Sequence, residues 1–247
     1  MLPQHAAITF DFHNTLVHCD EWFTLEIRTL VSQFLRWRAD VQGDIVTSEQ
    51  AAAAETAYRA LRLDIQRHGN EQSAEECIAT VLPQIGETAS RDEIEQGVET
   101  IMRATLNQAT PVPGAPAVVQ ALHRAGAPLG IVSSAVYHPF LVWALERFGM
   151  LDAFQIVTTS ASAGFYKSRP EIYWSTLTQL NAEPRRSVHI GDSLRYDVDG
   201  AQRAGMRAVW FNRRAEQLTN GERPDLTLTS FDDAAPALLD FLAEGSS

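Results

Sequence analysis

The chain has 247 residues, of which 45% are hydrophobic and 21% are charged, a composition typical of a soluble globular protein. This length accommodates one large domain, or a core domain that carries a smaller inserted one. The net charge of −11 argues against nucleic acid as the main partner, because clustered Lys and Arg bind nucleic-acid backbones. No apolar run reaches the length of a membrane span, and the first residues lack a signal-peptide pattern. We therefore expect a cytoplasmic protein without a membrane partner.

The first predicted element is a short buried strand over residues 8–10, which polar residues follow at once. If the backbone stays extended through Phe12, the side chains of Asp11 and His13 point to the same face. A carboxylate at the end of a buried strand is well placed to act as a nucleophile or a metal ligand. Asp and Asn are also common turn residues, so this stretch alone fits a plain turn as well.

Residues 20–108 carry helical patterns and little else. Apolar residues at helical spacing predict a helix over 21–38, followed by a turn over 41–44, and an Ala-rich helix over 48–68. Capping-box patterns at 73–76 and 90–93 predict the starts of two more helices, and the second of these helices ends near residue 108. Four helices joined by short polar turns predict a small antiparallel bundle.

Two prolines and a glycine at 110–114 mark a boundary, and beyond it strands and helices alternate. This alternation predicts an α/β fold, a Rossmann-like doubly wound parallel sheet with helices on both faces. The predicted core comprises residues 1–18 and 110–247, and the predicted cap, an inserted α-helical bundle, comprises residues 19–109. The core strands are expected at 128–134, 154–159, 187–190, 207–211 and 225–228, and its helices at 115–125, 139–148, 170–180, 197–204 and 232–242.

Polar residues follow several of these predicted strands, and ligands of such sheets bind beyond the carboxyl ends of the strands. We therefore expect five residues to meet there: Asp11, Ser133, Lys167, Asp192 and Asp197. Lys167 is the only lysine beside nineteen arginines, and its compact ammonium differs from a planar guanidinium, so we expect a role that Arg cannot fill. Ser133 also fits a strand cap, and Asp197 also fits the N-cap of the next helix.

Four segments carry a resemblance to a known family. Residues 10–16 resemble an Asp-x-Asp-Gly-Thr motif, and residues 131–134 resemble an apolar strand that ends in Ser or Thr. Residues 167–173 resemble a lysine followed by a Pro-x-Ile-Tyr helix start, and residues 191–201 resemble a Gly-Asp-Ser-x-x-x-Asp motif. In this order the segments resemble the haloacid dehalogenase-like (HAD) hydrolase superfamily. The helices after the first strand are similar to the helical cap of one subgroup, so the resemblance spans essentially the whole chain.

The resemblance implies a phosphatase that acts on a small phosphorylated metabolite. Asp11 would attack phosphorus in line and form an aspartyl-phosphate that water then hydrolyses. Mg²⁺ would be held by the carboxylates of Asp11 and Asp192 and by the backbone carbonyl of His13. Lys167 would neutralise charge on Asp11 and on the phosphoryl group. Ser133 and Ser134 would bind the phosphoryl oxygens. Thr15 and Asp197 would hold the nucleophile and the metal ligands in place from behind.

The sequence departs from the family pattern at two positions, since His13 stands where phosphatases carry a second Asp and Asn14 where they carry Gly. That Asp protonates the leaving oxygen, and general acid–base catalysis is worth roughly 10²–10⁴-fold in rate. Imidazole has an ordinary pKa of about 6.5 and suits proton transfer near neutral pH, although Mg²⁺ and Lys167 disfavour its charged form. His13 therefore fits a replacement acid–base group, a residue that shapes the substrate site, or a filler in a nearly inactive protein.

Two alternatives to a phosphatase follow from this departure. A 2-haloacid dehalogenase also lacks the second Asp, because halide leaves without a proton. Those enzymes carry Ser-Ser-Asn in the fourth motif and need no metal, so Asp192 favours the phosphatase. The other alternative is a binding module that retains the phosphate pocket with little turnover. A phosphonatase is disfavoured, since its Schiff-base lysine comes from the cap and this cap contains no lysine.

No sequence pattern predicts the substrate or the oligomeric state. His18 and Asp20 lie close to Asp11 in the sequence, which makes them the best candidates for substrate contact. Other cap residues are candidates for the lining of the pocket, although long charged side chains on helices usually face water. These candidates are Trp22, Arg28, Arg36, Arg38, Tyr58 and Arg59.

Overall fold

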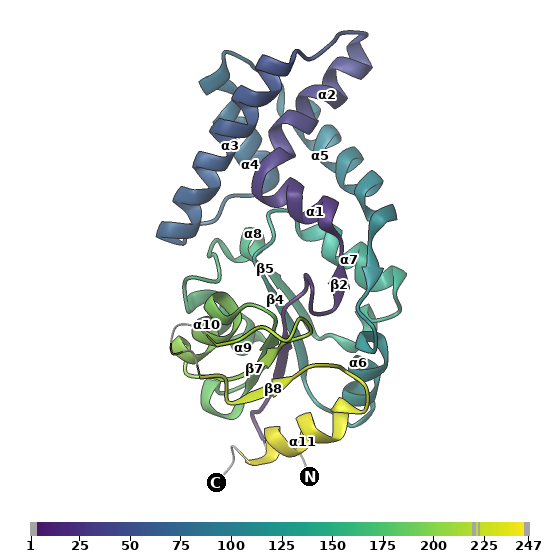
Figure 1. Cartoon of the computed structure of the whole chain (residues 1–247), viewed down its shortest axis with the longest axis vertical. Coiled ribbons are helices and arrows are strands. Elements are labelled where there is room, and N and C mark those ends of the chain that lie inside the picture. Colours follow the sequence, from purple (N-terminus) through teal and green to yellow (C-terminus); the bar gives the residue numbers. More distant parts are fainter. Residues whose placement is uncertain (1–3, 219–220, 222, 245–247) are drawn as a thin grey trace.

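The computed structural model describes residues 4–218, 221 and 223–244. Its centre is a parallel sheet of six strands in the order β5-β4-β1-β6-β7-β8 (Figure 1). The predicted α/β fold with a Rossmann-like parallel sheet is therefore confirmed. The predicted core also includes 1–3, 219–220, 222 and 245–247, which lie outside the described residues. The strands are β1 (Ile8–Phe10), β4 (Leu129–Ser133), β5 (Ile156–Thr159), β6 (Val188–Gly191), β7 (Arg207–Phe211) and β8 (Leu226–Leu228).

Helices cover both faces of the sheet, and the side chains of the strands alternate between two apolar clusters. Ile8 and Phe10 of β1 pack in one cluster, and Val132 of β4 packs in the other. The first cluster includes residues of α6 (Ala115–Arg124), α7 (His138–Arg147) and α11 (Ala234–Glu244). The second cluster includes residues of α9 (Glu171–Gln179) and α10 (Asp199–Arg203). A short helix, α8 (Ser160–Ala163), follows β5. Both faces are buried, so the strand ends are left to meet a ligand.

The helical cap lies beyond the carboxyl end of β1 (Figure 1). Two short strands that pair antiparallel, β2 (Val17–His18) and β3 (Thr110–Pro111), hold its two ends side by side, next to the predicted limits of the cap. Its helices are α1 (Asp20–Thr24), α2 (Leu30–Gln42), α3 (Ser48–His68), α4 (Ala74–Val81) and α5 (Arg91–Thr105). Within the described residues, every helix is too short or too polar to cross a membrane.

The first cap helix is longer than predicted and is not a plain α-helix. It starts at Asp20, passes through a π-helical turn at Leu25–Thr29 and continues to Gln42. Gly43 ends it with a φ of +76°, so the turn predicted over 41–44 begins late. A π-helical turn is wider than an α-helical one, and the spacing of apolar residues does not reveal it.

The two predicted capping boxes differ in the structure. Ser73 forms a complete box, because its side chain accepts from the Glu76 backbone and the Glu76 side chain accepts from the Ser73 backbone. At the start of α5, Ser90 accepts from the Glu93 backbone N–H at 3.2 Å, but the described hydrogen bonds include no return bond to the Glu93 side chain. The second box is therefore only half formed.

Candidate active site

The strand ends and the cap enclose a cavity of about 390 Å³, a volume suited to a small-molecule ligand. The core contributes the residues that the sequence predicts to meet: Asp11 after β1, Ser133 at the end of β4, Asp192 after β6, and both Lys167 and Asp197. The cap covers them with Trp22, Phe23, Glu26, Ile27, Arg62 and Gln66. The predicted convergence at the carboxyl ends of the strands is thus present.

Lys167 is a buried cation on the core side of the cavity, with only 2% of its surface exposed. Its Nζ lies 2.5 Å from Oδ1 of Asp11 and 2.6 Å from Oδ1 of Asp197. Burial alone would lower the pKa of Lys167, but the two carboxylates outweigh it and raise the pKa, so the ammonium stays charged. A single compact ammonium therefore serves two carboxylates, a geometry that differs from that of a planar guanidinium fork.

Asp197 supports the site from within a helical turn and does not cap a helix, so that prediction is wrong. The turn Leu194–Val198 is π-helical, and Ser193 caps it by accepting from the Tyr196 N–H at 3.2 Å. Asp197 instead accepts from the Lys167 ammonium and from the Ser193 N–H at 2.8 Å. Burial would raise the pKa of Asp197, but Lys167 and the hydrogen bonds it accepts hold that pKa well below its usual range.

Asp11, Asp192 and Asp197 present oxygens that all lie within 4.8 Å of one another. Burial and the neighbouring Asp11 raise the pKa of Asp192, because Lys167 alone does not balance three carboxylates. Burial also raises the pKa of Asp11, against the lowering effect of Lys167. Carboxylate oxygens are the ligands that Mg²⁺ prefers, and a divalent cation would relieve this repulsion. The residues present therefore fit a magnesium ion between Asp11 and Asp192.

The His13 side chain is almost fully buried, with 9% of the residue exposed. Its ring lies parallel to that of Phe23 at a centroid distance of 4.8 Å, and the ring of His18 lies 6.0 Å away. Burial and the nearby His18 lower the pKa of His13 to about 4. The imidazole is therefore neutral near pH 7. A neutral imidazole can accept a proton, but it is a poor donor to a leaving group.

Asn14 has a φ of 61°, in the left-handed region that Asn tolerates better than most residues. This conformation accounts for Asn where the family pattern has Gly. The Asn14 N–H donates to the Val17 carbonyl at 2.8 Å and closes a tight turn. The turn returns the chain from His13 to β2, so residues 13 and 18 lie side by side.

The three hydroxyl groups that the sequence predicts for the site differ in their contacts. Ser133 is buried and lines the cavity, in keeping with a phosphate-binding role. Ser134 also lines the cavity, but its Oγ accepts from the Lys167 backbone N–H at 3.2 Å and so positions the lysine. Thr15 is buried, and its Oγ1 has no hydrogen-bond partner among the described residues. The predicted support of Asp11 by Thr15 is not formed as a hydrogen bond.

Most of the cap residues that the sequence offers as candidates do not line the cavity. Trp22 does. Tyr58 is buried and donates to the Glu26 carbonyl at 2.8 Å. The four candidate arginines (Arg28, Arg36, Arg38 and Arg59) lie outside the lining, and two of them pair elsewhere, as Arg28–Glu55 at 3.0 Å and Arg38–Glu87 at 2.5 Å. The preference of long charged side chains for water describes Arg28, Arg36 and Arg59, which are exposed, but not Arg38, whose side chain is only 14% exposed.

The cap arginine that lines the cavity is Arg62, which the sequence analysis does not single out. It is 2% exposed and pairs with the buried Glu71 at 2.5 Å. A signal for it exists in the sequence, because the buried positions of α3 follow helical spacing and include Arg62. They are Ala51, Ala54, Tyr58, Arg62 and Ile65.

Glu26 connects the cap to the core at the same cavity. Its Oε2 accepts from the Val136 N–H at 2.9 Å, in the segment that follows β4. Burial raises the pKa of Glu26 to about 8 against the opposing charge of Arg62, so the carboxyl is largely protonated at neutral pH. The lid of the cavity is thus fixed to the core by a hydrogen bond from the backbone.

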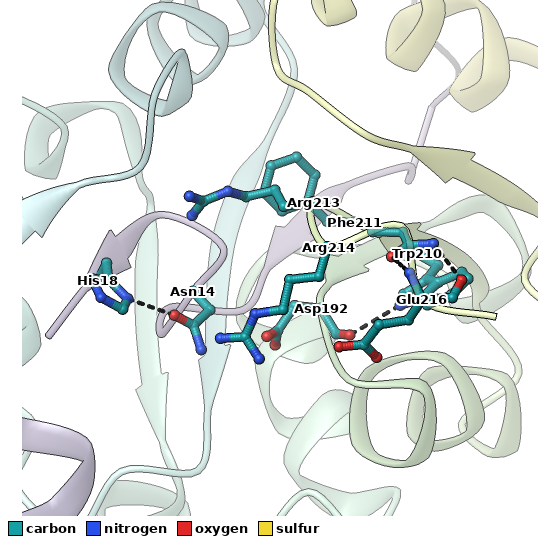
Figure 2. A pocket seen from close by; sticks show the side chains of 9 residues that line it. Asn14, His18, Asp192, Trp210, Phe211, Arg213, Arg214 and Glu216 are labelled. Atoms are coloured by element: carbon teal, nitrogen blue, oxygen red, sulfur yellow. Dashed lines mark hydrogen bonds between the residues drawn. The ribbon is translucent and has the colours of Figure 1, made fainter. Parts of the chain in front are cut away.

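A smaller pocket of about 150 Å³ adjoins the cavity, and Figure 2 shows the residues around it. Asn14, Asp192 and Arg214 line both spaces. His18, a predicted substrate contact, lines the smaller pocket, and Asp20, the other candidate, lines the cavity. Arg214 also lowers the pKa of Asp192 slightly against the larger effect of burial.

The chain matches characterised proteins along most of its length. A family model described as a haloacid dehalogenase-like hydrolase matches residues 5–205. The chain is 29% identical to the pyrimidine 5'-nucleotidase YjjG of Escherichia coli, over 58% of its own length and 64% of that protein's. It is 26% identical to a glyceraldehyde 3-phosphate phosphatase of Pyrococcus abyssi, over 83% of its own length and 80% of that protein's. It thus spans less than two thirds of the first of these relatives.

A solved structure shares the fold. A 2-haloacid dehalogenase from Pseudomonas syringae has a TM-score of 0.70 at 20% identity, over 96% of this chain and 99% of that one. At this identity the likeness shows the fold and not the reaction. The family model covers far more than half of the chain and includes Asp11, Lys167 and Asp192. The chain therefore belongs to the haloacid dehalogenase-like hydrolase family.

Proposed function

We propose that the chain is a Mg²⁺-dependent phosphatase that acts on a small phosphorylated metabolite through an aspartyl-phosphate on Asp11. The observation that carries this proposal is the 2.5 Å contact between the Lys167 ammonium and Asp11. An oxygen of Asp192 also lies within 4.8 Å of an oxygen of Asp11. A carboxylate that attacks an anionic ester needs cations beside it, because the two partners otherwise repel each other. Relatives named for pyrimidine 5'-nucleotides and for glyceraldehyde 3-phosphate support the same class of substrate.

The residues of the chain supply the nucleophile and the balancing charge for the first half of the reaction. Asp11 attacks phosphorus as the ester P–O bond breaks and the leaving oxygen departs with the bonding electrons. Lys167 neutralises the charge that develops on the phosphoryl oxygens, and Ser133 donates a hydrogen bond to one of them. Mg²⁺ held by Asp11, Asp192 and the His13 backbone carbonyl would supply further positive charge to the phosphoryl group. Water then attacks the phosphorus of the aspartyl-phosphate, which restores the Asp11 carboxylate and releases phosphate.

We place His13 in the second half of this reaction, as the group that accepts a proton from the attacking water. Its neutral, buried ring cannot protonate the leaving oxygen as the usual Asp does. The first half is then slow for an alkyl ester, whose alkoxide must take its proton from water, and faster for a leaving group that departs without a proton. His13 therefore replaces the second Asp as a base but not as an acid.

The main alternative is a 2-haloacid dehalogenase, which has the same fold in Pseudomonas syringae. Asp192 argues against it. Burial beside Asp11 makes the charged form of the Asp192 carboxyl unfavourable, and a cation is what would offset that cost. A dehalogenase needs no metal and gains nothing from another buried carboxyl group next to its nucleophile.

Parallel assays of phosphate and halide release test the proposal. We expect the chain to release phosphate from an aryl phosphate in the presence of Mg²⁺, to stop when EDTA removes the metal, and to release no chloride from 2-chloropropionate. Asp192→Asn keeps the side-chain volume and removes the charge, so it should raise the required Mg²⁺ concentration by about tenfold or more. Metal-independent chloride release would favour the dehalogenase. Phosphate binding with neither product would favour the binding module, and both results contradict the proposal.

A further inference from the structure

A second group of potential metal ligands lies beside the carboxylate site, on the turn between β1 and α1. His13, His18 and Asp20 each offer one ligand atom, and these atoms all lie within 4.8 Å of one another. The Asn14 turn brings the two histidines together, because it reverses the chain between them. The group contains two imidazoles and one carboxylate, whereas the neighbouring site contains carboxylates only.

His18 is oriented as metal-binding histidines usually are. Its Nδ1 lies 2.7 Å from Oδ1 of Asn14, a contact that Figure 2 shows as a dashed line. A metal-binding histidine commonly donates one ring N–H to such an oxygen, which leaves the lone pair of the other nitrogen free. That nitrogen, Nε2, lies 3.6 Å from Oδ2 of Asp20. The separation is long for a hydrogen bond but close to the roughly 3.3 Å between two ligands that are each about 2.0 Å from one tetrahedral ion.

His13 supplies an independent observation. The residue is nine-tenths buried, yet its Nε2 has no hydrogen-bond partner among the described residues. Buried polar atoms without a partner are costly and rare in folded proteins, so this nitrogen calls for a ligand. Cys19 lies between the other two ligands in the sequence, but its thiol points to the Thr105 carbonyl at 3.7 Å and takes no part.

We propose that His13, His18 and Asp20 form a binding site for a divalent transition metal ion of the Zn²⁺ type. Such an ion would occupy the lone pair of the His13 ring and so block the proton transfer that the proposed function assigns to it. Three protein ligands that leave one position open to water are typical of zinc sites with an accessible ion. Imidazole nitrogens favour Zn²⁺, Co²⁺ or Ni²⁺ over Mg²⁺, so the two neighbouring sites would select different ions. The site is open to solvent, since the side chains of His18 and Asp20 are 42% and 78% exposed.

Titration of the untagged chain with Zn²⁺ in saturating Mg²⁺ tests the site, with Co²⁺ absorption in the visible range as a second readout. We expect one Zn²⁺ per chain and Co²⁺ bands typical of low coordination. His18→Ala and Asp20→Asn should each weaken Zn²⁺ binding by about tenfold or more. Circular dichroism should show that both variants are folded, which the exposure of these two side chains makes the expected result.

Two matched controls locate the ion. His123→Ala removes an exposed histidine of α6 outside the cluster and should leave Zn²⁺ binding unchanged. Asp192→Asn disables the carboxylate site and should also leave Zn²⁺ bound, which makes the outcome independent of phosphatase activity. The proposal is wrong if the unaltered chain binds no Zn²⁺. It is equally wrong if folded His18→Ala retains full affinity, or if Asp192→Asn abolishes binding.

Discussion

Replacement of Lys167 with methionine is expected to lower the turnover of a phosphate ester by about a hundredfold or more. Methionine keeps most of the side-chain volume and removes the charge. Loss of one positioned donor costs about 3 kcal/mol of transition-state stabilisation, and each 1.4 kcal/mol is a tenfold change in rate. Asp11 and Asp197 would also lose their shared cation, which raises the pKa of the nucleophile further. Steady-state kinetics with saturating Mg²⁺ measure the effect.

Arg169→Met is the matched control, because it removes a cation two residues further along the chain. Arg169 pairs with Glu171, lies outside the cavity lining and is partly exposed, so its loss should leave turnover close to that of the unaltered chain. Lys167→Arg should also lower turnover, since a planar guanidinium does not place one compact point charge between Asp11 and Asp197. Turnover like that of the unaltered chain in folded Lys167→Met would remove the electrostatic basis of the proposed reaction.

Replacement of His13 with aspartate is expected to raise the turnover of alkyl phosphates by about 10²-fold, the lower end of the usual effect of a general acid. An alkoxide leaves slowly without a proton, and an aspartic acid at this position supplies one. The turnover of an aryl phosphate should change far less, because an aryl oxide departs without protonation. Turnover of one alkyl and one aryl ester is measured in parallel with Mg²⁺ for both proteins. The ratio of alkyl to aryl turnover should be higher in His13→Asp than in the unaltered chain.

His13→Asn is the control for this experiment, since asparagine has the shape of aspartate and no acid. It should produce no gain with either ester. An equal gain in His13→Asn and His13→Asp would point to relief of steric hindrance by the smaller side chain. A loss of both activities in His13→Asp would show that aspartate cannot replace the imidazole, contrary to the expected gain.

Much of the fold and the position of the site could be predicted from the sequence, because burial leaves strong patterns. Short apolar runs typical of strands alternate with segments that have helical spacing of apolar residues. That alternation predicts a parallel sheet and the edge of the sheet at which ligands bind. Asp11, Ser133 and Asp192 each stand at or just after an apolar run, so the topology alone brings them together. Lys167 stood out because it is the only lysine in the chain.

The rest depends on contacts that only the folded chain makes. Arg62 is buried because Glu71, on the loop after α3, neutralises it, and a lone arginine on a helix normally indicates a solvated face. Asp197 looked like an N-cap because the π-helical turn that begins at Leu194 has no clear sequence pattern. The state of His13 depends on Phe23 and His18, whose rings reach it only through the turn at Asn14.

The central claim is that a phosphoryl group is carried on Asp11. Rapid acid quench of the Mg²⁺-loaded enzyme during turnover, followed by proteolysis and mass spectrometry, tests it most directly. We expect one phosphoryl group on the peptide that contains Asp11, and none in Asp11→Asn, which should also be inactive. An unmodified peptide at every quench time in an enzyme that is releasing phosphate would contradict it, and so would phosphate release by Asp11→Asn at the rate of the unaltered chain.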